Sequence, residues 1–510
     1  MRLLRNLGLA AASGLLMTFA FPNWNVWPLA IASVVVLWFA LARCGAWAGL
    51  LIGWVFGLAF LLPHFEFARF AVGPVPWLAL GLASGLFYGV FGAAWATVRR
   101  SAMLVNARAW VQPLAFATLF GATEEFRSIF PFGGFPWGRV AFSQAESPFV
   151  NLAWAGGALL VTMAVVLAGA VLALGIEAGM ARRWAYVAIA PVVAIGLGAA
   201  GVFVPINAQA EAGKLSVAVV QGNVPDRGLD SFQQARAVTR NHYNETLNLM
   251  RDNFGAIDIV IWPENSVDLD PRVDAQNEEL VVGAAQRANA PLLFGTQDLT
   301  PEEGRYNTSL LINTSGKVLA EYRKQRPAPF AEFIPMRDFS RKFSDAVDRV
   351  QRDMLAGPGP AVMDLPAPVL GRTVTIGTII CFEVSYDEIV RQSVRNGAEI
   401  IIVQTNNATF GTTAESTQQL AMTRLRAIEH GRTTIQSSTV GVSAIVLPDG
   451  RILDETELWT AASMSEKVPL RTSRTPASYF GGVERYTVLG VGMLVFFFGA
   501  RKRLADRYDW

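Results

Sequence analysis

Cys381 is one of only two cysteines in a chain of 510 residues, and it directly follows an apolar run. The run "TVTIGTII" (373–380) has the character of a buried strand, and the carboxylate of Glu383 comes two residues after the cysteine. A thiol at the end of a strand could serve as a nucleophile. Its unperturbed pKa of about 8.5 means that a neighbouring base or cation must help to form the reactive thiolate.

Two other stretches contain side chains that could give this help. Glu264 follows a proline in "WPEN" (262–265), which makes it a candidate general base. Lys324 in "RKQRPAPFAEF" (323–333) is a cation that could lower the pKa of the thiol and stabilise an oxyanion. Glu332 stands eight residues after Lys324 and could pair with it and orient it.

Each of these residues also has a purely structural interpretation. A lone cysteine after a strand is often a buried small hydrophobic residue. Glu264 could cap a following helix, and Lys324 could belong to a solvated charged loop. The combination favours chemistry over these separate explanations.

Other kinds of catalytic site find little support in the sequence. The three histidines, His64, His242 and His430, do not have the spacing of a zinc site. A Cys–His pair would need His242 or His430, and neither follows a predicted strand. No G-x-S-x-G or Walker A motif is present. We therefore expect neither a metal nor an organic cofactor.

The second half of the chain contains the elements that would position these residues. Apolar runs typical of buried strands occupy 215–221, 256–262, 290–295, 308–314, 373–380, 398–405, 433–438 and 442–447. Helical patterns lie between several of them, at 231–252 and 414–431 for example. This alternation predicts a layered α/β domain over residues 206–483. Glu264, Cys381 and the pair Asn406 and Asn407 all follow strands, where ligands of such sheets gather.

The composition indicates a membrane protein. Hydrophobic residues make up 52% of the chain and charged residues 16%, and the mean hydropathy is +0.33. The net charge of +2 and the lack of a basic stripe with interleaved aromatic residues give no indication of nucleic-acid binding.

Long apolar segments predict the membrane spans. They lie at 7–21, 27–42, 46–62, 75–98, 110–122, 149–174, 184–204 and 484–500, and the first, second and fifth are short for a span. We expect residues 1–205 to form a membrane domain with about seven transmembrane helices. Residues 484–510 would form a C-terminal transmembrane helix and a cytoplasmic tail.

The distribution of charge predicts the orientation. Within the membrane part, alternate loops contain most of the basic residues: Arg2 and Arg5, Arg43, Arg99, Arg100 and Arg108, Arg182 and Arg183, and Arg501, Lys502 and Arg503. The loops between them contain His64, Glu66, Arg69, Glu124, Glu125, Arg127 and Arg139. The positive-inside rule then places both termini in the cytoplasm and the α/β domain outside.

Several motifs together resemble one protein family. "WPEN", the lysine followed by the glutamate of "PFAEF", and "ICFE" resemble the Glu–Lys–Cys triad of the nitrilase superfamily. The helices with "FAFPNWNVWPLA" and "FPFGGFPWGR" are similar to the membrane part of bacterial apolipoprotein N-acyltransferases. "VVQGNVP", "YNTSLLI" and "LAMTRLRAIEHGR" extend the resemblance over essentially the whole chain.

The resemblance implies a polytopic α-helical membrane domain and an extracytoplasmic, nitrilase-like αββα sandwich in a bacterial inner membrane. It implies that Cys381 is the nucleophile, Glu264 the general base and Lys324 the stabiliser of the tetrahedral intermediate. Glu332, Glu383 and Phe382 match supporting positions, although many relatives have tyrosine where Phe382 stands. The implied reaction moves an acyl chain from a phospholipid to the cysteine, and then to the amino-terminal diacylglyceryl-cysteine of a lipoprotein.

Two further interpretations of the sequence remain open. A membrane-tethered amidohydrolase could use the same triad with water as second nucleophile, and a non-catalytic partner of another membrane enzyme could keep the fold. Separately, Phe339, Phe343, Val347 and Val350 recur at helical spacing within 336–354. This stripe predicts either an amphipathic lid on the membrane or a helix packed on its own domain.

Overall fold

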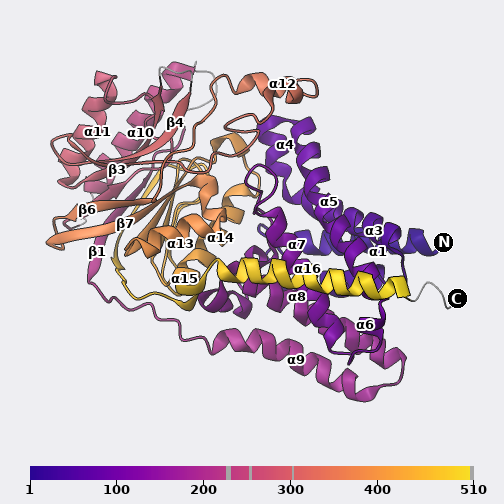
Figure 1. Cartoon of the computed structure of the whole chain (residues 1–510). Coiled ribbons are helices and arrows are strands. Elements are labelled where there is room, and N and C mark those ends of the chain that lie inside the picture. The colour runs from indigo at the N-terminus through magenta and orange to yellow at the C-terminus, as the bar shows by residue number, and fades with distance from the viewer. Residues whose placement is uncertain (225–230, 252–254, 301–303, 506–510) are drawn as a thin grey trace. The chain divides into compact units, whose positions relative to one another are not determined.

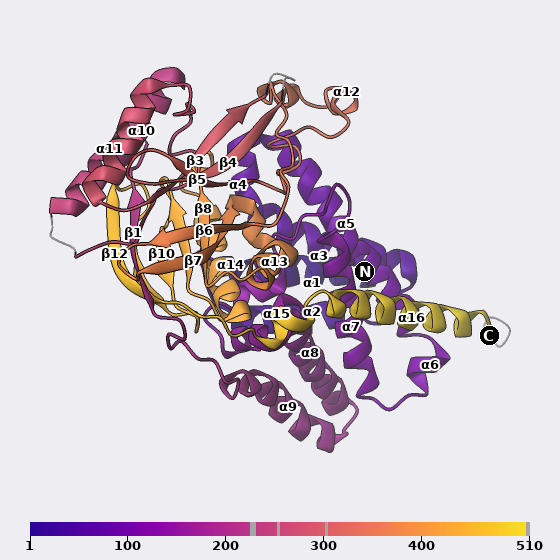
Figure 2. The same ribbon diagram turned by 60° about the vertical axis from the view of Figure 1, so that its left-hand side comes forward.

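The computed structural model describes residues 1–224, 231–251, 255–300 and 304–505. The chain divides into two compact units, Met1–Pro205 with Phe480–Trp510, and Ile206–Tyr479 (Figures 1 and 2). The first unit is helical and the second contains all the strands of the described residues. Each unit is described by itself.

Helices coincide with all eight predicted spans of the first unit. The α-helices are α1 (Arg2–Phe19), α2 (Pro28–Ala40), α3 (Ala46–His64), α4 (Glu66–Val72), α5 (Pro74–Val98), α6 (Ala102–Val105), α7 (Val111–Arg127), α8 (Ala153–Met180), α9 (Trp184–Val202) and α16 (Val483–Ala505). Two 3-10 helices, η1 (Val140–Gln144) and η2 (Pro148–Leu152), precede α8.

Within the described residues, five helical segments are long and apolar enough to cross a membrane. They are Ala46–His64, Pro74–Val98, Pro148–Met180, Trp184–Val202 and Val483–Arg501. Helices α1, α2 and α7 are not among them, so the count of about eight spans stays a prediction. Close packing joins α3 and α5, since a Cβ on Gly53 would lie 2.1 Å from the carbonyl oxygen of Tyr88.

The acidic residues expected in the loop after 122 belong instead to a helix. Helix α7 continues to Arg127, and Glu124, Glu125 and Arg127 are all buried. Glu125 pairs with Arg139 and accepts a hydrogen bond from Arg485 of α16 at 2.8 Å. Buried charges need such partners, and the pairing allows the helix to extend past the apolar segment.

The second unit contains two six-stranded sheets. The first has the order β12-β1-β2-β3-β4-β5 and the second the order β11-β10-β9-β8-β7-β6. Parallel pairing joins β1, β2 and β3 in one sheet and β7, β8 and β9 in the other. The strands are β1 (Lys214–Gln221), β2 (Ile259–Ile261), β3 (Leu292–Leu299), β4 (Arg305–Ile312), β5 (Val318–Arg323), β6 (Val362–Ala367), β7 (Arg372–Ile380), β8 (Ile400–Thr405), β9 (Thr434–Ser438), β10 (Ala444–Val446), β11 (Ile452–Glu455) and β12 (Ala462–Pro469).

Helices cover the outer faces of both sheets, as Figures 1 and 2 show. Helices α10 (Ser231–Arg251) and α11 (Ala275–Ala288) pack on the first sheet, and α13 (Asp387–Arg395) and α14 (Glu415–His430) pack on the second. The remaining helices are α12 (Arg337–Ser340), η3 (Asp345–Arg349), η4 (Cys381–Ser385), η5 (Ala408–Phe410) and α15 (Pro476–Phe480). The predicted layered α/β fold, with an αββα order, is confirmed.

Buried polar contacts connect the two sheets to each other. Gln404 at the end of β8 donates from Nε2 to the carbonyl oxygen of Trp262 at 2.6 Å. Ser309 of β4 donates to Oε1 of the same glutamine. These bonds fix the carboxyl end of β8 against the residues that follow β2.

The segment 336–354 does not form the continuous helix that its apolar spacing predicts. Helix α12 ends at Ser340, and the separate turn η3 follows at Asp345. Val347 and Val350 are buried with Ile334, whereas Phe339 and Phe343 are 55% and 65% exposed. The Arg337 guanidinium donates to the carbonyl oxygens of Val347 and Val350, which folds the segment back on itself.

Candidate active site

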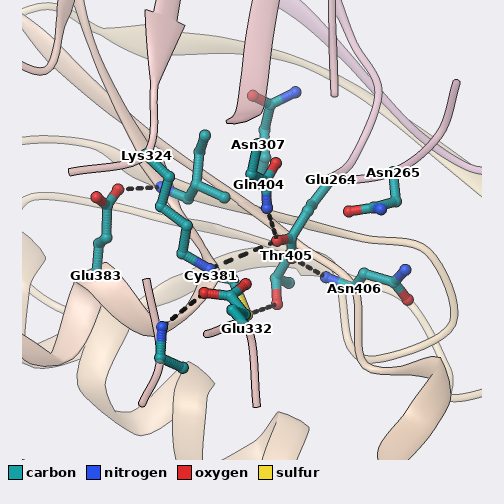
Figure 3. Close-up of polar contacts among 12 residues, drawn as sticks. Glu264, Asn265, Asn307, Lys324, Glu332, Cys381, Glu383, Gln404, Thr405 and Asn406 are labelled. Carbon is teal, nitrogen blue, oxygen red and sulfur yellow. Dashed lines mark hydrogen bonds and ion pairs between the residues drawn. The ribbon is translucent and has the colours of Figure 1, made fainter. Parts of the chain in front are cut away.

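Cys381 occupies a strained turn between strand β7 and the 3-10 helix η4. Its φ angle is +51°, a left-handed conformation that is uncommon for residues with a side chain. The side chain is half-buried, and its Sγ lies 3.4 Å from the hydroxyl oxygen of Thr405, the last residue of β8 (Figure 3). Such strain at a reactive side chain is a common property of functional sites.

Glu264 reaches the same place from the other sheet. It follows β2 after Trp262 and Pro263, and it is buried. Its Oε1 accepts a hydrogen bond from Asn307 Nδ2 at 2.6 Å, and its Oε2 accepts one from the backbone N–H of Asn406 at 2.8 Å. Two hydrogen bonds therefore hold the carboxylate in one orientation.

Gly295 on β3 makes room for the Glu264 backbone. A Cβ added at this glycine would lie 2.7 Å from the Cα of Glu264. The Gly295 N–H also donates to the carbonyl oxygen of Pro263 at 3.1 Å. A glycine is needed here for a close approach of two backbones.

Lys324 directly follows β5 and is 1% exposed. Its Nζ donates to Glu332 Oε1 at 2.7 Å and lies 3.7 Å from Glu264 Oε1. Glu332 Oε2 in turn accepts a hydrogen bond from the Ala328 N–H at 2.7 Å. Figure 3 shows the ammonium group between the two carboxylates, with Cys381 beside it.

Glu383 joins the lysine loop to the cysteine turn. Its Oε1 accepts hydrogen bonds from the backbone N–H groups of Gln325 at 2.6 Å and Arg326 at 3.1 Å. Its Oε2 accepts one from the Ile380 N–H at 2.9 Å, and the Tyr322 hydroxyl donates to the carboxylate at 3.0 Å. This buried carboxylate thus positions Lys324 against Cys381 without contacting either side chain.

Phe382 is the second residue of η4 and is buried. Its ring packs edge to face against Tyr386, with the ring centres 5.3 Å apart. This contact holds the η4 turn, which contains the backbone N–H of the residue directly after Cys381.

The ionisation behaviour of the site follows from its burial. Burial raises the pKa of the Cys381 thiol well above its ordinary value, the charge of Glu264 raises it further, and Lys324 opposes both. Burial also raises the pKa of Glu264, against the opposing charge of Lys324. Burial alone would lower the pKa of Lys324, but the carboxylates of Glu332 and Glu264 outweigh it, and the net shift is upward. The upward shift keeps Lys324 a cation, and the raised pKa of Glu264 makes its carboxylate a better acceptor for a proton.

Among the described residues, no hydrogen bond joins a histidine to Cys381. His242 of α10 contacts the Val238 carbonyl oxygen through Nδ1 at 2.8 Å, and His430 of α14 contacts Ser478 Oγ at 2.9 Å. The other cysteine, Cys44, donates a hydrogen bond to the Leu41 carbonyl oxygen at 3.2 Å and lies in the helical unit.

Sequence reasoning missed several residues that hold this site. Asn307, on β4, and Thr405 contact Glu264 and Cys381 respectively, but Asn307 directly precedes the predicted run 308–314 and Thr405 ends the predicted run 398–405. Asn406 was recognised as a strand-end residue, yet it acts through its backbone N–H, which any residue type would supply. The only signal in the sequence for Asn307 and Thr405 was a polar side chain at the edge of an apolar run.

Models of two protein families match the chain. Residues 13–171 match the apolipoprotein N-acyltransferase N-terminal domain, and residues 216–474 match the carbon-nitrogen hydrolase family. An apolipoprotein N-acyltransferase of Mycolicibacterium smegmatis is 35% identical over 96% of this chain and 84% of its own length. The one from Azotobacter vinelandii is 29% identical over 98% of this chain and 95% of its own length.

Two solved structures of the nitrilase superfamily are similar to part of this chain. An amidase from Nesterenkonia has a TM-score of 0.40 and 17% identity, covering 56% of this chain and 98% of the amidase. A Saccharomyces cerevisiae member has a TM-score of 0.37 and 18% identity, covering 53% of this chain and 94% of its own.

Proposed function

This chain belongs to the apolipoprotein N-acyltransferase family, and we propose that it moves an acyl chain from a membrane phospholipid to a lipoprotein. The acceptor is the α-amino group of the lipoprotein's N-terminal diacylglyceryl-cysteine. The protein is a membrane enzyme, with apolar helices in one unit and a nitrilase-like catalytic unit. We place that unit on the extracytoplasmic face of a bacterial inner membrane.

One observation carries the proposal. Lys324 Nζ lies 2.7 Å from Glu332 and 3.7 Å from Glu264, in a buried site that also contains the Cys381 thiol. A base, a cation and a nucleophile at one place are what acyl transfer through a covalent intermediate requires.

The first half-reaction forms a thioester. Glu264 takes the thiol proton, and the Cys381 sulfur attacks the ester carbonyl of the phospholipid. The Lys324 ammonium and the Phe382 N–H stabilise the oxyanion. The C–O bond then breaks, and the lysophospholipid leaves with the proton that Glu264 had taken.

The second half-reaction consumes the thioester. The α-amine of the lipoprotein attacks the carbonyl, Glu264 accepts a proton from the nitrogen, and the C–S bond breaks. The sulfur leaves as a thiolate and recovers its proton from Glu264. The products are an amide and the original thiol, which is a ping-pong cycle.

The match to the carbon-nitrogen hydrolase family favours one alternative, an amidohydrolase that uses water as second nucleophile. The two functions differ in their product. Purified protein would be incubated with phospholipid carrying an isotope-labelled acyl chain and with a synthetic diacylated lipopeptide. We expect the label in an amide on the lipopeptide. Label found only in free fatty acid would contradict the proposal, and Cys44→Ala would serve as a control that keeps activity.

A further inference from the structure

A group of buried polar side chains lies beside Cys381, and the mechanism above does not use it. Its members are Thr405 at the end of β8, Asn407, and Glu415 and Gln419 on α14. All four are buried, and Thr405 and Gln419 are completely enclosed. Buried polar groups at such density are expected to have a definite hydrogen-bond arrangement.

The Thr405 hydroxyl has one proton and two acceptors for it. Its Oγ1 lies 2.8 Å from Gln419 Oε1 and 3.4 Å from Cys381 Sγ. A hydroxyl can donate to only one of them at a time. An amide carbonyl oxygen is a stronger acceptor than an uncharged thiol sulfur, so we expect the hydroxyl to donate to Gln419 while Cys381 is a thiol.

Gln419 presents an oxygen to Thr405 because of the residues behind it. Asn407 Nδ2 donates to Gln419 Oε1 at 3.0 Å and to Glu415 Oε2 at 2.6 Å. Asn407 Oδ1 accepts a hydrogen bond from Ser438 Oγ at 2.5 Å. Ser438 as donor and Glu415 as acceptor fix which end of the Asn407 amide is oxygen and which is nitrogen. Because the Asn407 nitrogen faces Gln419, the Gln419 amide presents its oxygen there.

Ionisable groups reach the sulfur from three elements. Glu264 after β2 disfavours the thiolate and Lys324 after β5 favours it. Glu415 of α14 adds to the effect of Glu264 only when it is ionised, and burial raises its pKa to about 8. Thr405 is an uncharged donor among them. A hydrogen bond to the charged form of a group stabilises that form.

We propose that the Thr405 hydroxyl turns from Gln419 to the Cys381 thiolate during acyl transfer, and that Gln419 is a positioning residue that competes for its proton. The inference rests on the proposed role of Cys381 as nucleophile. Glu264 takes the thiol proton, while Thr405 keeps its own proton and redirects it to the negatively charged sulfur. When the C–S bond forms, the sulfur loses its charge and the Thr405 proton returns to Gln419 Oε1.

The competition predicts opposite effects for two substitutions. Thr405→Val removes the donor and should lower the alkylation rate of Cys381 by iodoacetamide about tenfold near neutral pH, since a hydrogen bond to a charged group is lost. The midpoint of the rate against pH should rise by about one unit. Gln419→Met removes the competing acceptor and should raise the rate and lower the midpoint. Thr405→Ser should restore the rate of the unmodified protein.

Alkylation would be measured on the full-length protein by mass spectrometry of the Cys381 peptide. Thr433→Val is a matched control, because the Thr433 hydroxyl is also buried and donates to the Pro469 carbonyl oxygen at 2.8 Å. A thermal melt of each variant identifies loss of folding. An equal loss of alkylation rate in Thr405→Val and Gln419→Met, or no change of rate in either variant, would overturn the inference.

The assay separates this inference from the proposed function. Alkylation needs neither lipid nor lipopeptide, so opposite shifts would support the Thr405–Gln419 competition even if no acyl transfer occurred. Conversely, if the protein transfers acyl chains but neither substitution changes the alkylation rate of Cys381, only the Thr405–Gln419 competition is overturned.

Discussion

At the scale of single residues, the site combines Cys381, which lies in a strained turn, with carboxylates that have different surroundings. Glu264 and Glu332 both contact Lys324, but Glu264 alone also accepts hydrogen bonds from Asn307 and Asn406. Glu383 contacts none of the reacting groups and instead binds backbone N–H groups on both sides of the site. In the proposed mechanism the three glutamates have three roles: base, partner of the cation, and support of the turn.

Lys324 provides the first prediction at this scale. Lys324→Ala should lower the rate of thioester formation on the order of 100–1,000-fold, since it removes one stabiliser of the oxyanion. Binding of phospholipid should change little, because the lysine is 1% exposed. Single-turnover kinetics measure the rate, and Lys342→Ala, at an exposed lysine, is the control. A variant that keeps its rate would exclude the role given to Lys324.

Glu415 predicts a dependence of stability on pH. Burial raises its pKa from an ordinary 4.5 to about 8, the Asn407 hydrogen bond opposes this, and the charge of Glu264 adds to it. Below 4.5 the carboxyl is protonated in both the folded and the unfolded chain. Between 4.5 and 8 only the folded chain keeps the proton, so stability falls as pH rises, by at most about 1.4 kcal/mol per unit.

Glu415→Gln removes this dependence and keeps an acceptor for Asn407. The melting temperature of the variant should therefore rise relative to the unmodified protein between pH 5 and pH 8. Glu455→Gln, at an exposed glutamate of β11, controls for the loss of a carboxyl. If the difference in melting temperature between Glu415→Gln and the unmodified protein stays constant from pH 5 to pH 8, the raised pKa of Glu415 is refuted.

The residues that bear reactive groups could be predicted from the sequence, whereas most of their supports could not. Cys381 and Glu264 stand out because a thiol and a carboxyl follow apolar runs, and Lys324 stands out because Glu332 lies eight residues after it. Thr405 and Asn307 lie at the edge of predicted strands and Glu415 lies in a predicted helix, where none of them differs from an ordinary polar residue. Their partners come from 24, 43 and 8 residues away in the chain, so only the fold reveals the pairing.

At the scale of elements, the site depends on two sheets that meet at their strand ends. Glu264 and Lys324 follow strands of the first sheet, Cys381 follows β7 of the second, and Thr405 is the last residue of β8. The apolar runs predicted β7 and β8 well because residues 376–380 and 400–405 are all buried. Strands β5, β6, β11 and β12 were missed because they are partly exposed and carry mixed residues.

One predicted strand is shorter in the structure than in the sequence. The run 256–262 gives only β2, of three residues, and the residue just before it, Asp258, has a buried carboxylate. It accepts hydrogen bonds from the Ser216 N–H at 2.9 Å and the Val369 N–H at 2.7 Å. A buried acid that binds backbone groups of two other segments cannot be inferred from apolar periodicity.

The exposed pair Phe339 and Phe343 predicts contact of this segment with lipid. Their rings lie 5.1 Å apart, and Arg341 and Lys342 beside them are exposed. We expect liposomes to slow tryptic cleavage at Arg341 and Lys342, because aromatic and basic residues together favour a membrane surface.

The controls for this test lie in the same domain. Replacing both phenylalanines with aspartate should remove the protection, whereas Leu453→Asp, at an exposed leucine of β11, should leave it. Cleavage that is indifferent to liposomes would leave the segment as part of the domain surface with no role at the membrane.

At the scale of the whole molecule, the sequence carries two different patterns that correspond to two units. Long apolar segments dominate residues before 205 and after 483, and short apolar runs with polar helices dominate the residues between. Helix positions were predictable, but helix ends were less so. Helix α7 extends five residues past its apolar segment because Glu124, Glu125 and Arg127 have buried partners.

Orientation in the membrane is the prediction at this scale. Arg182 and Arg183 lie between α8 and α9, on the side that the positive-inside rule places in the cytoplasm. In a variant without Cys44 and Cys381, a cysteine would be placed at Arg182 or at Lys317, an exposed residue between β4 and β5. A membrane-impermeant maleimide added to intact cells should label only Lys317→Cys. Labelling of Arg182→Cys in intact cells would reverse the orientation.

The central claim is that Cys381 becomes acylated during turnover. Purified protein would be incubated with a phospholipid of one acyl composition, and the peptide with Cys381 would be weighed by mass spectrometry. We predict one acyl mass on this peptide, none on the Cys44 peptide, and discharge after addition of a diacylated lipopeptide. A Cys381 peptide that stays unmodified while N-acylated lipopeptide accumulates would contradict the thioester mechanism.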